Sequence, residues 1–429
     1  MPRRLSRRQF VQSSGLAAGA FALWGVPKSV FGANERLNVA CIGVGNQGKY
    51  DLENVKHENI VAMADIDEKF LAAASEHAPK AKKFADYRKM LEEMGKGIDA
   101  VVVATPDHSH AYAALTAMNL GKHCYCEKPL AHNVHEVRLM RQAAKQNNLV
   151  TQMGTQIHAG ENYRRVVEVI KAGAIGPVKE THHWVDGYYS GGDRPKEKQS
   201  APGHVNWDLW LGPAPHRDYH GGLHPFSWRG WWDFGGGKFS DMACHHMDIA
   251  YWALDLTLPE SVEAEGPPDH PESAPKWEIV KFRYPARGAQ PPVHVSWYHG
   301  DKRPPQFADG LIPKNWGNSL FVGEKGMLLT DYNRHVLLPE ADFKDYKRPG
   351  KSIPKSIGHH REWTEACKTG GKTLCNFDYS GALAEAVQLG NVAYRTGKKI
   401  IYDPQAGKAV GYAEADKFIK REYRKGWEL

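Results

Sequence analysis

Short apolar-rich runs alternate with amphipathic stretches through the first third of the chain. The runs have the length and β-branched content of buried strands, and they lie at Leu37–Ile42, Ile60–Ala64, Ile98–Thr105, Lys122–Glu127 and Leu149–Gly154. Helical spacing fills the intervals, from Gln47 onward and at Glu68–His77, Asp86–Met94, Ser109–Asn119 and Val134–Gln146. Because strands that alternate with helices build parallel sheets covered on both faces, residues 34–155 predict a doubly wound α/β domain.

Residues 156–429 predict a second α/β domain with a large, open, mainly antiparallel sheet. Segments with a period of two, bounded by Gly and Pro, are typical of antiparallel strands, and they lie at Val178–Val185, Ser261–Glu265, Glu278–Tyr284, Val293–His299, Ser319–Val322, Met327–Asp331, Val336–Leu338 and Lys399–Tyr402. Helices are expected at Glu161–Ala172, Asp241–Leu254, Arg361–Thr369, Tyr379–Thr396 and Ala413–Arg424. We expect the terminal helices to pack back onto the first domain.

The N-terminus has the features of an export signal. Ser6-Arg7-Arg8-Gln9-Phe10-Val11 matches a twin-arginine pattern, and a mildly apolar run from Gly15 to Trp24 follows it. That run is too short to span a bilayer, and no later segment is long and apolar enough, so we expect no membrane insertion. Residues 1–33 are predicted to be a signal peptide for the twin-arginine translocation machinery, which would place the protein in the periplasm. A basic tail with a chance pair of arginines is the alternative.

Most of the positive charge of the chain lies in this N-terminal segment. The formal net charge is +7, and the five basic residues and no acids of residues 1–33 leave +2 for the rest. That balance predicts no nucleic-acid partner. The six cysteines show neither a disulfide framework nor the paired spacing of a metal site, so we expect buried free thiols.

The most specific motif joins the first predicted strand to its helix. Gly43, Gly45 and Gly48 fit the Gly-x-Gly-x-x-Gly pattern, in which glycine permits a tight turn and the close approach of backbone to a pyrophosphate. Backbone N–H groups at the helix start, around Asn46 and Gln47, are suited to hold the phosphates. The turn therefore predicts a dinucleotide site.

An acid after the second strand predicts which dinucleotide binds. Asp65 ends the run Ile60–Ala64, at the spacing expected for a carboxylate that binds the ribose hydroxyls of adenosine. The extra phosphate of NADP would meet this carboxylate with no arginine beside it. We therefore expect NAD, with NADP as the less favoured cofactor.

Polar residues follow the strand Ile98–Thr105 at the edge of the sheet where ligands bind. Residues Thr105–His110, among them Thr105, Pro106 and His110, are expected to line the cofactor cleft. Histidines solvated in a loop near a helix start are the alternative for His108 and His110.

The next strand ends in Glu127 and Lys128, which are also expected in the cleft. An ammonium at this position can bind a substrate hydroxyl and stabilise the alkoxide that develops during oxidation. A surface pair between the two side chains is the alternative.

A second group of candidate catalytic residues follows a glycine triplet at 235–237. Asp241, His245 and Asp248 are spaced four and three apart, so they share one face of the predicted helix. A neutral imidazole oriented by a carboxylate one turn away is suited to accept a hydroxyl proton. The same spacing suits a metal site, and a structural histidine is a third interpretation, although we expect no metal.

Between Asp186 and Gly237 the chain is rich in tryptophan, tyrosine, histidine and glycine. Indole faces beside polar groups suit a sugar ring, which has one apolar face and several hydroxyls. Substrate contacts are expected from Trp228, Arg229, Trp231 and His246. Aromatic residues that merely fill the core are the alternative for each tryptophan.

Taken together, these motifs resemble the glucose–fructose oxidoreductase/inositol dehydrogenase (Gfo/Idh/MocA) family over nearly all of the chain after residue 33. The matching segments are Gly43-x-Gly45-x-x-Gly48, Ala64-Asp65, Thr105-Pro106-x-x-x-His110, Glu127-Lys128-Pro129, Gly154-x-Gln156 and Asp241-x-x-x-His245. The tryptophan-rich middle and the ending Arg-Glu-Tyr-Arg-Lys-Gly-Trp at 421–427 resemble the exported bacterial branch. Ala243 departs from the family pattern, where glycine is common.

The resemblance implies a Rossmann domain followed by an α/β domain whose open sheet often serves oligomerisation, so we expect a homo-oligomer. It implies that Lys128, Asp241 and His245 are catalytic and that Gln156 lies near the nicotinamide. The resulting hypothesis is an NAD(P)-dependent oxidoreductase acting on a sugar, polyol or glycoside, with a tightly held cofactor. A non-catalytic dinucleotide- or carbohydrate-binding protein and a metal-dependent sugar lyase or isomerase are the alternatives.

Overall fold

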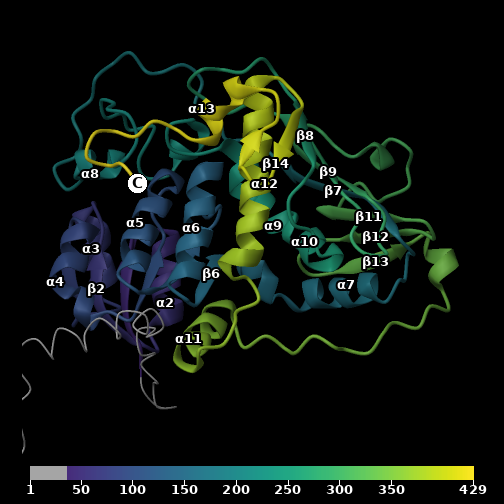
Figure 1. Cartoon of the computed structure of the whole chain (residues 1–429), viewed down its shortest axis with the longest axis horizontal. Helices are drawn as coiled ribbons and strands as arrows, with labels where there is room; N and C mark the ends of the chain where they lie inside the picture. Colours follow the sequence, from purple (N-terminus) through teal and green to yellow (C-terminus); the bar gives the residue numbers. More distant parts are fainter. Residues whose placement is uncertain (1–35) are drawn as a thin grey trace, which may run out of the picture.

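The computed structural model describes residues 36–429, which form two parts lying side by side (Figure 1). The predicted signal peptide at residues 1–33 lies outside the described residues. Within residues 36–429, no helix combines the length and the apolar character needed to cross a bilayer. All six cysteines are buried and free, as the sequence predicts.

The first part is a six-stranded sheet in the order β3-β2-β1-β4-β5-β6. Its strands are β1 (Asn38–Ile42), β2 (Asn59–Ala64), β3 (Lys82–Phe84), β4 (Ala100–Val103), β5 (His123–Glu127) and β6 (Thr151–Gly154). Every adjacent pair is parallel. The connecting helices are α2 (Gln47–Val55), α3 (Glu68–Ser75), α4 (Tyr87–Met94), α5 (Asp107–Asn119) and α6 (Val134–Gln146). The order reverses between β1 and β4, which opens a cleft at the carboxyl ends of those strands.

The second part is a nine-stranded sheet in the order β13-β12-β11-β7-β10-β9-β8-β14-β15. Its strands are β7 (Val178–Asp186), β8 (Ser261–Glu265), β9 (Glu278–Tyr284), β10 (Val293–Gly300), β11 (Ser319–Gly323), β12 (Met327–Thr330), β13 (His335–Leu338), β14 (Ile400–Asp403) and β15 (Lys408–Ala409). The pair β7 and β10 is parallel, whereas the remaining pairs are antiparallel. The predicted α/β fold class with a mainly antiparallel second sheet is confirmed.

Helices of the second part cover this sheet and reach back to the first part. They are α7 (Glu161–Lys171), α8 (Trp207–Leu211), α9 (Gly237–His246), α10 (Asp248–Leu254), α11 (His359–Thr369), α12 (Phe377–Thr396) and α13 (Asp416–Ile419). Short 3₁₀ turns lie at Gly95–Gly97, Gln156–Ala159, Ser227–Gly230, Pro305–Phe307, Glu340–Phe343 and Ala413–Ala415. In Figure 1, α12 runs between the two parts; it packs on α6 of the first part and on β8 of the second.

Three helix predictions are wrong in their bounds. The helix expected at Asp241–Leu254 begins earlier, at Gly237, and is divided at Met247 into α9 and α10. The helix expected at Ala413–Arg424 is only a 3₁₀ turn and the four-residue α13, because the chain becomes extended at Lys420. Helix α5, expected at Ser109–Asn119, begins at Asp107 with Pro106 as its N-cap residue.

Candidate active site

The glycine-rich turn between β1 and α2 has the geometry that the sequence predicts. Gly43 has a φ of +78°, and a Cβ there would lie 2.7 Å from the carbonyl oxygen of Ala104. A Cβ at Gly48 would lie 2.1 Å from the carbonyl oxygen of Gly43. Larger residues would therefore push β1, β4 and α2 apart, because backbone atoms cannot yield as a flexible side chain does. At Gly45 a Cβ would meet the ring of Phe70, at 2.4 Å.

Asp65 lies beside this turn at the end of β2. Its carboxylate accepts hydrogen bonds from the backbone N–H groups of Val44, at 2.8 Å, and Asp67, at 2.9 Å. Burial raises the pKa of Asp65 to about 6, although these N–H groups oppose the shift. The two hydrogen bonds fix the carboxylate at the wall of the cleft, where the ribose hydroxyls of a dinucleotide would reach it.

A cleft runs from the glycine-rich turn to the candidate catalytic lysine. The expected cofactor-binding residues that line it are Gly43, Gly45, Asn46, Gln47, Asp65, Thr105, Pro106, His110, Glu127 and Lys128. The second part closes the cleft with Leu209, Trp210, His224, Pro225, Trp228, Arg229 and Trp427. The structure therefore brings residues from five strand ends and from two distant segments around one cavity.

Lys128 and Asp241 form the central ion pair of the site. The ammonium nitrogen of Lys128 lies 2.5 Å from Oδ1 of Asp241 and also donates to the backbone carbonyl of Asp241, at 3.0 Å. Arg229 approaches the same Oδ1, with its Nε at 3.4 Å. Burial raises the pKa of Asp241, but the charges of Lys128 and Arg229 outweigh it and hold that pKa at about 2. Lys128 and Arg229 line the cleft, whereas Asp241 does not. Asp241 therefore acts on the cleft through these two side chains.

This ion pair corrects the role predicted for Asp241. From its spacing the sequence predicts that Asp241 orients His245, one helical turn later. In the structure the carboxylate of Asp241 binds Lys128 instead. A charged partner attracts a carboxylate more strongly than a neutral imidazole does where water is largely excluded.

His245 is partly buried near the end of α9. Among the described residues, none forms a hydrogen bond with its imidazole, whereas its backbone carbonyl accepts from the hydroxyl of Tyr163 at 3.1 Å. Burial and then the positive charge of Lys128 lower the pKa of His245 to about 3. The ring is therefore neutral at physiological pH, with a nitrogen lone pair available to an incoming group.

Glu127 anchors a buried polar cluster behind the glycine-rich turn. Its Oε1 accepts from the side-chain amides of Gln156, at 2.6 Å, and Gln47, at 3.3 Å. Gln47 also donates to Asp51, at 3.2 Å. Burial and the neighbouring Asp51 raise the pKa of Glu127 well above its usual range. Gln156 thus contacts the cleft indirectly, through Glu127. The alternative of a surface pair between Glu127 and Lys128 is wrong, because Lys128 pairs with Asp241.

The segment after β4 contains an acid to which the sequence assigns no role of its own. Asp107 is the first residue of α5, is 5% exposed and lines the cleft. Burial raises its pKa to about 7, although Lys128 and Arg229 act in the opposite direction. A variable position in a motif gave no signal for this acid, and the early start of α5 is what brings it inside.

The two histidines of this segment are buried rather than solvated. The ring of His108 contacts the carbonyl of Trp210, at 2.9 Å, and the ring of His110 contacts the carbonyl of Thr105, at 2.7 Å. His110 lines the cleft, as predicted. The loop alternative for both residues is therefore wrong.

Of the four residues expected to contact the substrate, two line the cleft and two do not. Trp228 and Arg229 line the cleft, and the guanidinium of Arg229 lies 4.4 Å from the ring centre of Trp228. Trp231 does not line the cleft. It packs in an apolar cluster with Trp228 and Trp210, with the guanidinium of Arg217 4.6 Å from its ring centre. His246 turns toward β7 and contacts the carbonyl of Trp184, at 2.9 Å.

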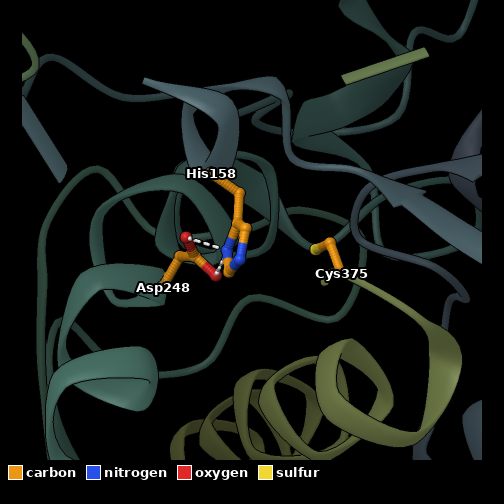
Figure 2. A group of neighbouring side chains, drawn as sticks. All are labelled: His158, Asp248 and Cys375. Carbon is orange, nitrogen blue, oxygen red and sulfur yellow. Dashed lines mark hydrogen bonds and ion pairs between the residues drawn. The ribbon is translucent and has the colours of Figure 1, made fainter. Parts of the chain in front are cut away.

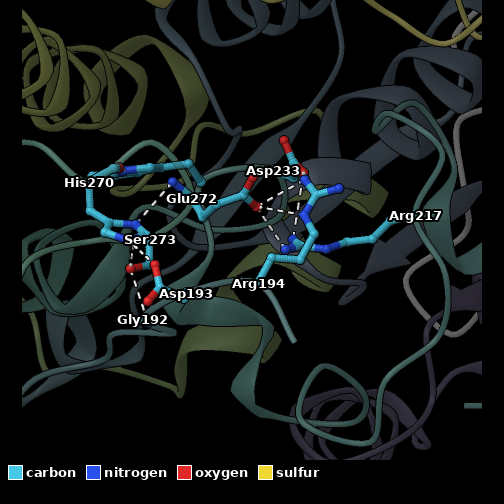
Figure 3. A network of polar contacts seen from close by, with 9 residues as sticks. Gly192, Asp193, Arg194, Arg217, Asp233, His270, Glu272 and Ser273 are labelled. Atoms are coloured by element: carbon cyan, nitrogen blue, oxygen red, sulfur yellow. Dashed lines mark hydrogen bonds and ion pairs between the residues drawn. The ribbon is translucent and has the colours of Figure 1, made fainter. Parts of the chain in front are cut away.

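A polar network explains why Trp231 is structural. Arg217 and Arg194 both donate to Glu272, at 2.8 and 3.0 Å (Figure 3). Asp233 lies beside the same two guanidinium groups. The network ties the tryptophan-rich segment to the loop around residue 272 and closes over Arg217, which in turn covers Trp231.

Asp248 belongs to a different cluster from the one that its spacing predicts. The division of the helix at Met247 turns Asp248 toward His158, whose Nδ1 lies 2.9 Å from a carboxylate oxygen (Figure 2). Tyr379 donates to Asp248 at 2.8 Å, and the ring of His158 stacks on Trp252. His158, Asp248 and Cys375 are all buried, with potential metal-ligand atoms within 4.8 Å of one another.

Neither the cluster of His158, Asp248 and Cys375 nor the residues at the cleft support the metal-dependent alternative. Burial raises the pKa of the Cys375 thiol, which opposes the thiolate that a metal requires. At the cleft, the ammonium of Lys128 occupies the side of Asp241 that a cation would need. His245 is not among the residues that line the cleft, whereas Lys128 is. The chemistry that the two side chains offer is proton transfer by a neutral imidazole and charge stabilisation by a paired ammonium.

Comparisons with known proteins identify the family. Residues 37–155 match the Gfo/Idh/MocA model described as an oxidoreductase family with an NAD-binding Rossmann fold. Residues 161–293 match the model of the same family's C-terminal alpha/beta domain. Together the two matches cover more than half of the chain. The chain belongs to the Gfo/Idh/MocA oxidoreductase family. This confirms the predicted family, the fold and the NAD cofactor.

Individual members of the Gfo/Idh/MocA family resemble the chain over part of its length. The myo-inositol 2-dehydrogenase of Thermotoga maritima is 26% identical over 143 residues, which are 33% of this chain and 42% of that protein. The levoglucosan dehydrogenase of Pseudarthrobacter phenanthrenivorans is 33% identical over 163 residues, 34% of this chain and 39% of that protein. The chain thus matches less than half the length of these curated relatives.

Solved structures extend the fold comparison to most of the chain. The WlbA dehydrogenase of Bordetella pertussis, in complex with NADH and UDP-GlcNAcA, has a TM-score of 0.61 at 18% identity. The alignment covers 86% of this chain and 99% of that one. At this identity the comparison supports the fold alone.

Proposed function

We propose that this chain is an NAD-dependent oxidoreductase that transfers hydride between a hydroxyl-bearing carbon of a sugar, polyol or glycoside and a tightly held nicotinamide cofactor. The observation that carries the proposal is the ion pair of Asp241 with Lys128, which lines the cleft of the glycine-rich turn. His245 lies one helical turn after Asp241, and the charge of Lys128 helps to lower its pKa. A protein that only binds dinucleotides or carbohydrates has no use for a buried ammonium beside a neutral imidazole.

The side chains divide the oxidation step between them. An imidazole nitrogen of His245 takes the hydroxyl proton, while Lys128 donates a hydrogen bond to the substrate oxygen and stabilises its charge as the carbonyl forms. Asp241 acts through Lys128, because its carboxylate holds the ammonium in place and charged. NAD, when bound, supplies the acceptor for the hydride that leaves the same carbon. In reduction the same groups return the proton.

The substrate class is supported by the cleft and by the relatives. Trp228 offers an apolar surface and Arg229 a hydrogen-bonding group next to the catalytic pair, a combination suited to a sugar ring. Relatives that match part of the chain are named inositol and levoglucosan dehydrogenases. We therefore place a polyhydroxylated ring beside Trp228.

The His245→Ala variant tests the proposal. With a panel of sugars, polyols and glycosides, we expect the rate of cofactor reduction, followed at 340 nm, to fall by about 10²–10⁴-fold, the usual contribution of a general base. The affinity of the variant for NAD, measured by fluorescence, should stay within about twofold of the affinity of the wild-type protein. The exposed His294 provides the control, since His294→Ala should leave both quantities unchanged. Unchanged turnover in His245→Ala would leave a binding protein as the better description.

We also propose export through the twin-arginine machinery with the cofactor already bound, followed by action in the periplasm. Free nicotinamide cofactor is scarce outside the cytoplasm, so a retained cofactor must be regenerated by paired oxidation and reduction within each turnover. The absorbance of the purified protein near 340 nm should rise or fall when a substrate is added, because the retained cofactor is then reduced or oxidised. Protein that is purified without cofactor and binds NAD weakly would contradict this proposal.

The open sheet of the second part provides the basis for a proposed homo-oligomer. A large open sheet of nine strands is suited to packing against a second copy. Light scattering of the purified protein tests this directly, and a monomer at micromolar concentration would contradict it.

A further inference from the structure

The last nine residues of the chain contact both parts of the molecule, because Arg421 binds helices of the first part and Arg424 binds the loop after α8. In Figure 1 the C-terminal segment leaves α13 and runs toward α8 and α5. Arg421 reaches the start of α5, where its Nη2 donates to the carbonyl of His108 at 2.6 Å. Its Nε donates to Glu136 of α6 at 2.9 Å. A charged side chain thus fastens the segment to two helices of the nucleotide-binding fold.

A second arginine fastens the segment to the loop after α8. The backbone N–H of Arg424 donates to the carbonyl of Pro213 at 3.1 Å. Its Nε donates to the carbonyl of Gly212 at 2.8 Å. The segment 421–427, which we call the C-terminal strap, therefore bridges α5, α6 and the tryptophan-rich segment.

The strap places Trp427 in the wall of the cofactor cleft. Trp427 is 9% exposed, and the guanidinium of Arg88 lies 4.2 Å from its ring centre. Trp427 and Tyr87 line both the cleft and a neighbouring hollow between α5 and α6. These two aromatic residues form the partition between the cavities, so removal of the indole would open the cleft to that hollow.

The position of Trp427 and Tyr87 in the cleft indicates which part of a dinucleotide they would face. Asp65 marks the ribose of the adenosine half of a dinucleotide. Ala85 and Tyr87, which follow the neighbouring strand β3, line the same cleft as Trp427. Lys128 and Arg229 lie toward the catalytic end. A flat, aromatic and mostly apolar wall beyond the ribose suits a purine base.

We propose that Trp427 contacts the adenine of the bound cofactor and that the C-terminal strap slows cofactor release. The inference rests on the proposed function, since it assumes that NAD fills the cleft. Trp427 is then a cofactor-binding residue, and Arg421 and Arg424 are positioning residues that hold it. The C-terminal strap also supplies a physical basis for a cofactor that stays bound through many turnovers.

Two ligands that differ only in the adenosine half provide the test. NAD carries adenosine, whereas nicotinamide mononucleotide lacks it. In the full-length Trp427→Ala variant we expect the Kd for NAD to rise by about tenfold, within the range for loss of an aromatic–base contact. The Kd for nicotinamide mononucleotide should stay within about twofold. The Trp277→Ala variant, altered in the second part away from the cleft, should bind both ligands as the original protein does.

A second variant keeps the proposal testable if Trp427→Ala does not fold. Arg424→Ala retains the indole but removes the side-chain hydrogen bonds to Gly212 and Asp208. NAD should therefore dissociate several-fold faster in a competition experiment. NAD affinity and release rate that are unchanged in both variants would overturn the proposal. Equal weakening of both ligands by Trp427→Ala would also overturn it, because that result indicates general disruption. An original protein that binds neither ligand would show instead that the proposed function itself is wrong.

Discussion

At the scale of single residues, the most consequential feature is the ion pair between Asp241 and Lys128. The two side chains lie 113 positions apart in the sequence and 2.5 Å apart in the structure. Spacing along a helix predicted a different partner, His245, because sequence patterns describe neighbours within one element only. The pairing follows from the meeting of β5 with α9, which no local pattern encodes.

Replacement of Asp241 by Asn should therefore act through the lysine. The pKa of Lys128 is lowered by burial but raised above its usual value overall, chiefly by Asp241. In Asp241→Asn the effect of burial remains while that support is lost, so the ammonium should deprotonate at lower pH. We expect kcat to fall by about tenfold or more at pH 7 and its alkaline limb to shift to lower pH.

A pH profile of kcat distinguishes this effect from a general loss of structure. The exposed Asp378, at the start of α12, provides the matched control, and Asp378→Asn should leave both the rate and the alkaline limb unchanged. A profile of Asp241→Asn that is lower but has the same alkaline limb would contradict a role exerted through Lys128.

Asp51 provides a prediction about stability rather than chemistry. It is fully buried, and burial raises its pKa from 3.8 to about 8 although Gln47 opposes the shift. Between pH 4 and 8 the folded protein therefore holds a proton that the unfolded chain has released, so stability falls as pH rises through this window. Asp51→Asn removes that loss and keeps an acceptor for His360, which lies 2.9 Å away.

We expect Asp51→Asn to raise the free energy of unfolding by about 1–2 kcal/mol at pH 8 and by much less at pH 4. Denaturant unfolding at both pH values measures the difference. The same gain at both pH values would mean that the aspartate is ionised in the folded protein.

At the scale of elements, the strand–helix alternation of the first part could be predicted because its strands are buried on both faces. Such strands have apolar runs that stand out from the amphipathic helices between them. The three-residue edge strand β3 gave no signal, since two of its three residues are exposed lysines. It forms because its backbone pairs with β2.

The second part shows where local patterns fail. The predicted final helix is replaced by the C-terminal strap, because Arg421 and Arg424 gain charge-assisted and backbone hydrogen bonds to distant elements. Trp427 therefore enters the cleft, and Asp107 does so through the early start of α5. Both depend on contacts between segments far apart in the sequence, whereas the glycine-rich turn and Lys128 depend on local motifs.

The turn between β1 and α2 yields an element-scale prediction. Gly48→Ala would place a Cβ 2.1 Å from the carbonyl oxygen of Gly43, so α2 must move away from the sheet. We expect a loss of about 2 kcal/mol or more in the free energy of unfolding, together with weaker NAD binding. Gly97 is exposed with no atom within 4 Å of an added Cβ, so Gly97→Ala should change neither. Equal effects of the two substitutions on unfolding and on NAD titration would contradict the role of helix–strand packing.

At the scale of the whole molecule, the relative position of the two parts depends on a buried charge at their junction. Glu385 of α12 is fully buried and accepts from Arg138 and Arg141 of α6, at 2.9 and 3.0 Å. Tyr402 of β14 donates to the same carboxylate at 2.5 Å. One acid thus joins the nucleotide-binding fold to the second sheet.

Removal of that acid should cost far more than removal of an exposed one. Glu385→Ala leaves two partly buried guanidinium groups without their anion, and breaking a buried pair from one side typically costs about 3–5 kcal/mol. Glu265, which pairs with Lys281 on the sheet surface, provides the control, since exposed pairs contribute little. Unfolding by urea should show a large loss for Glu385→Ala and no measurable change for Glu265→Ala. If both variants were equally stable, the position of the cleft-closing segments would have to depend on apolar packing between α6 and α12 alone.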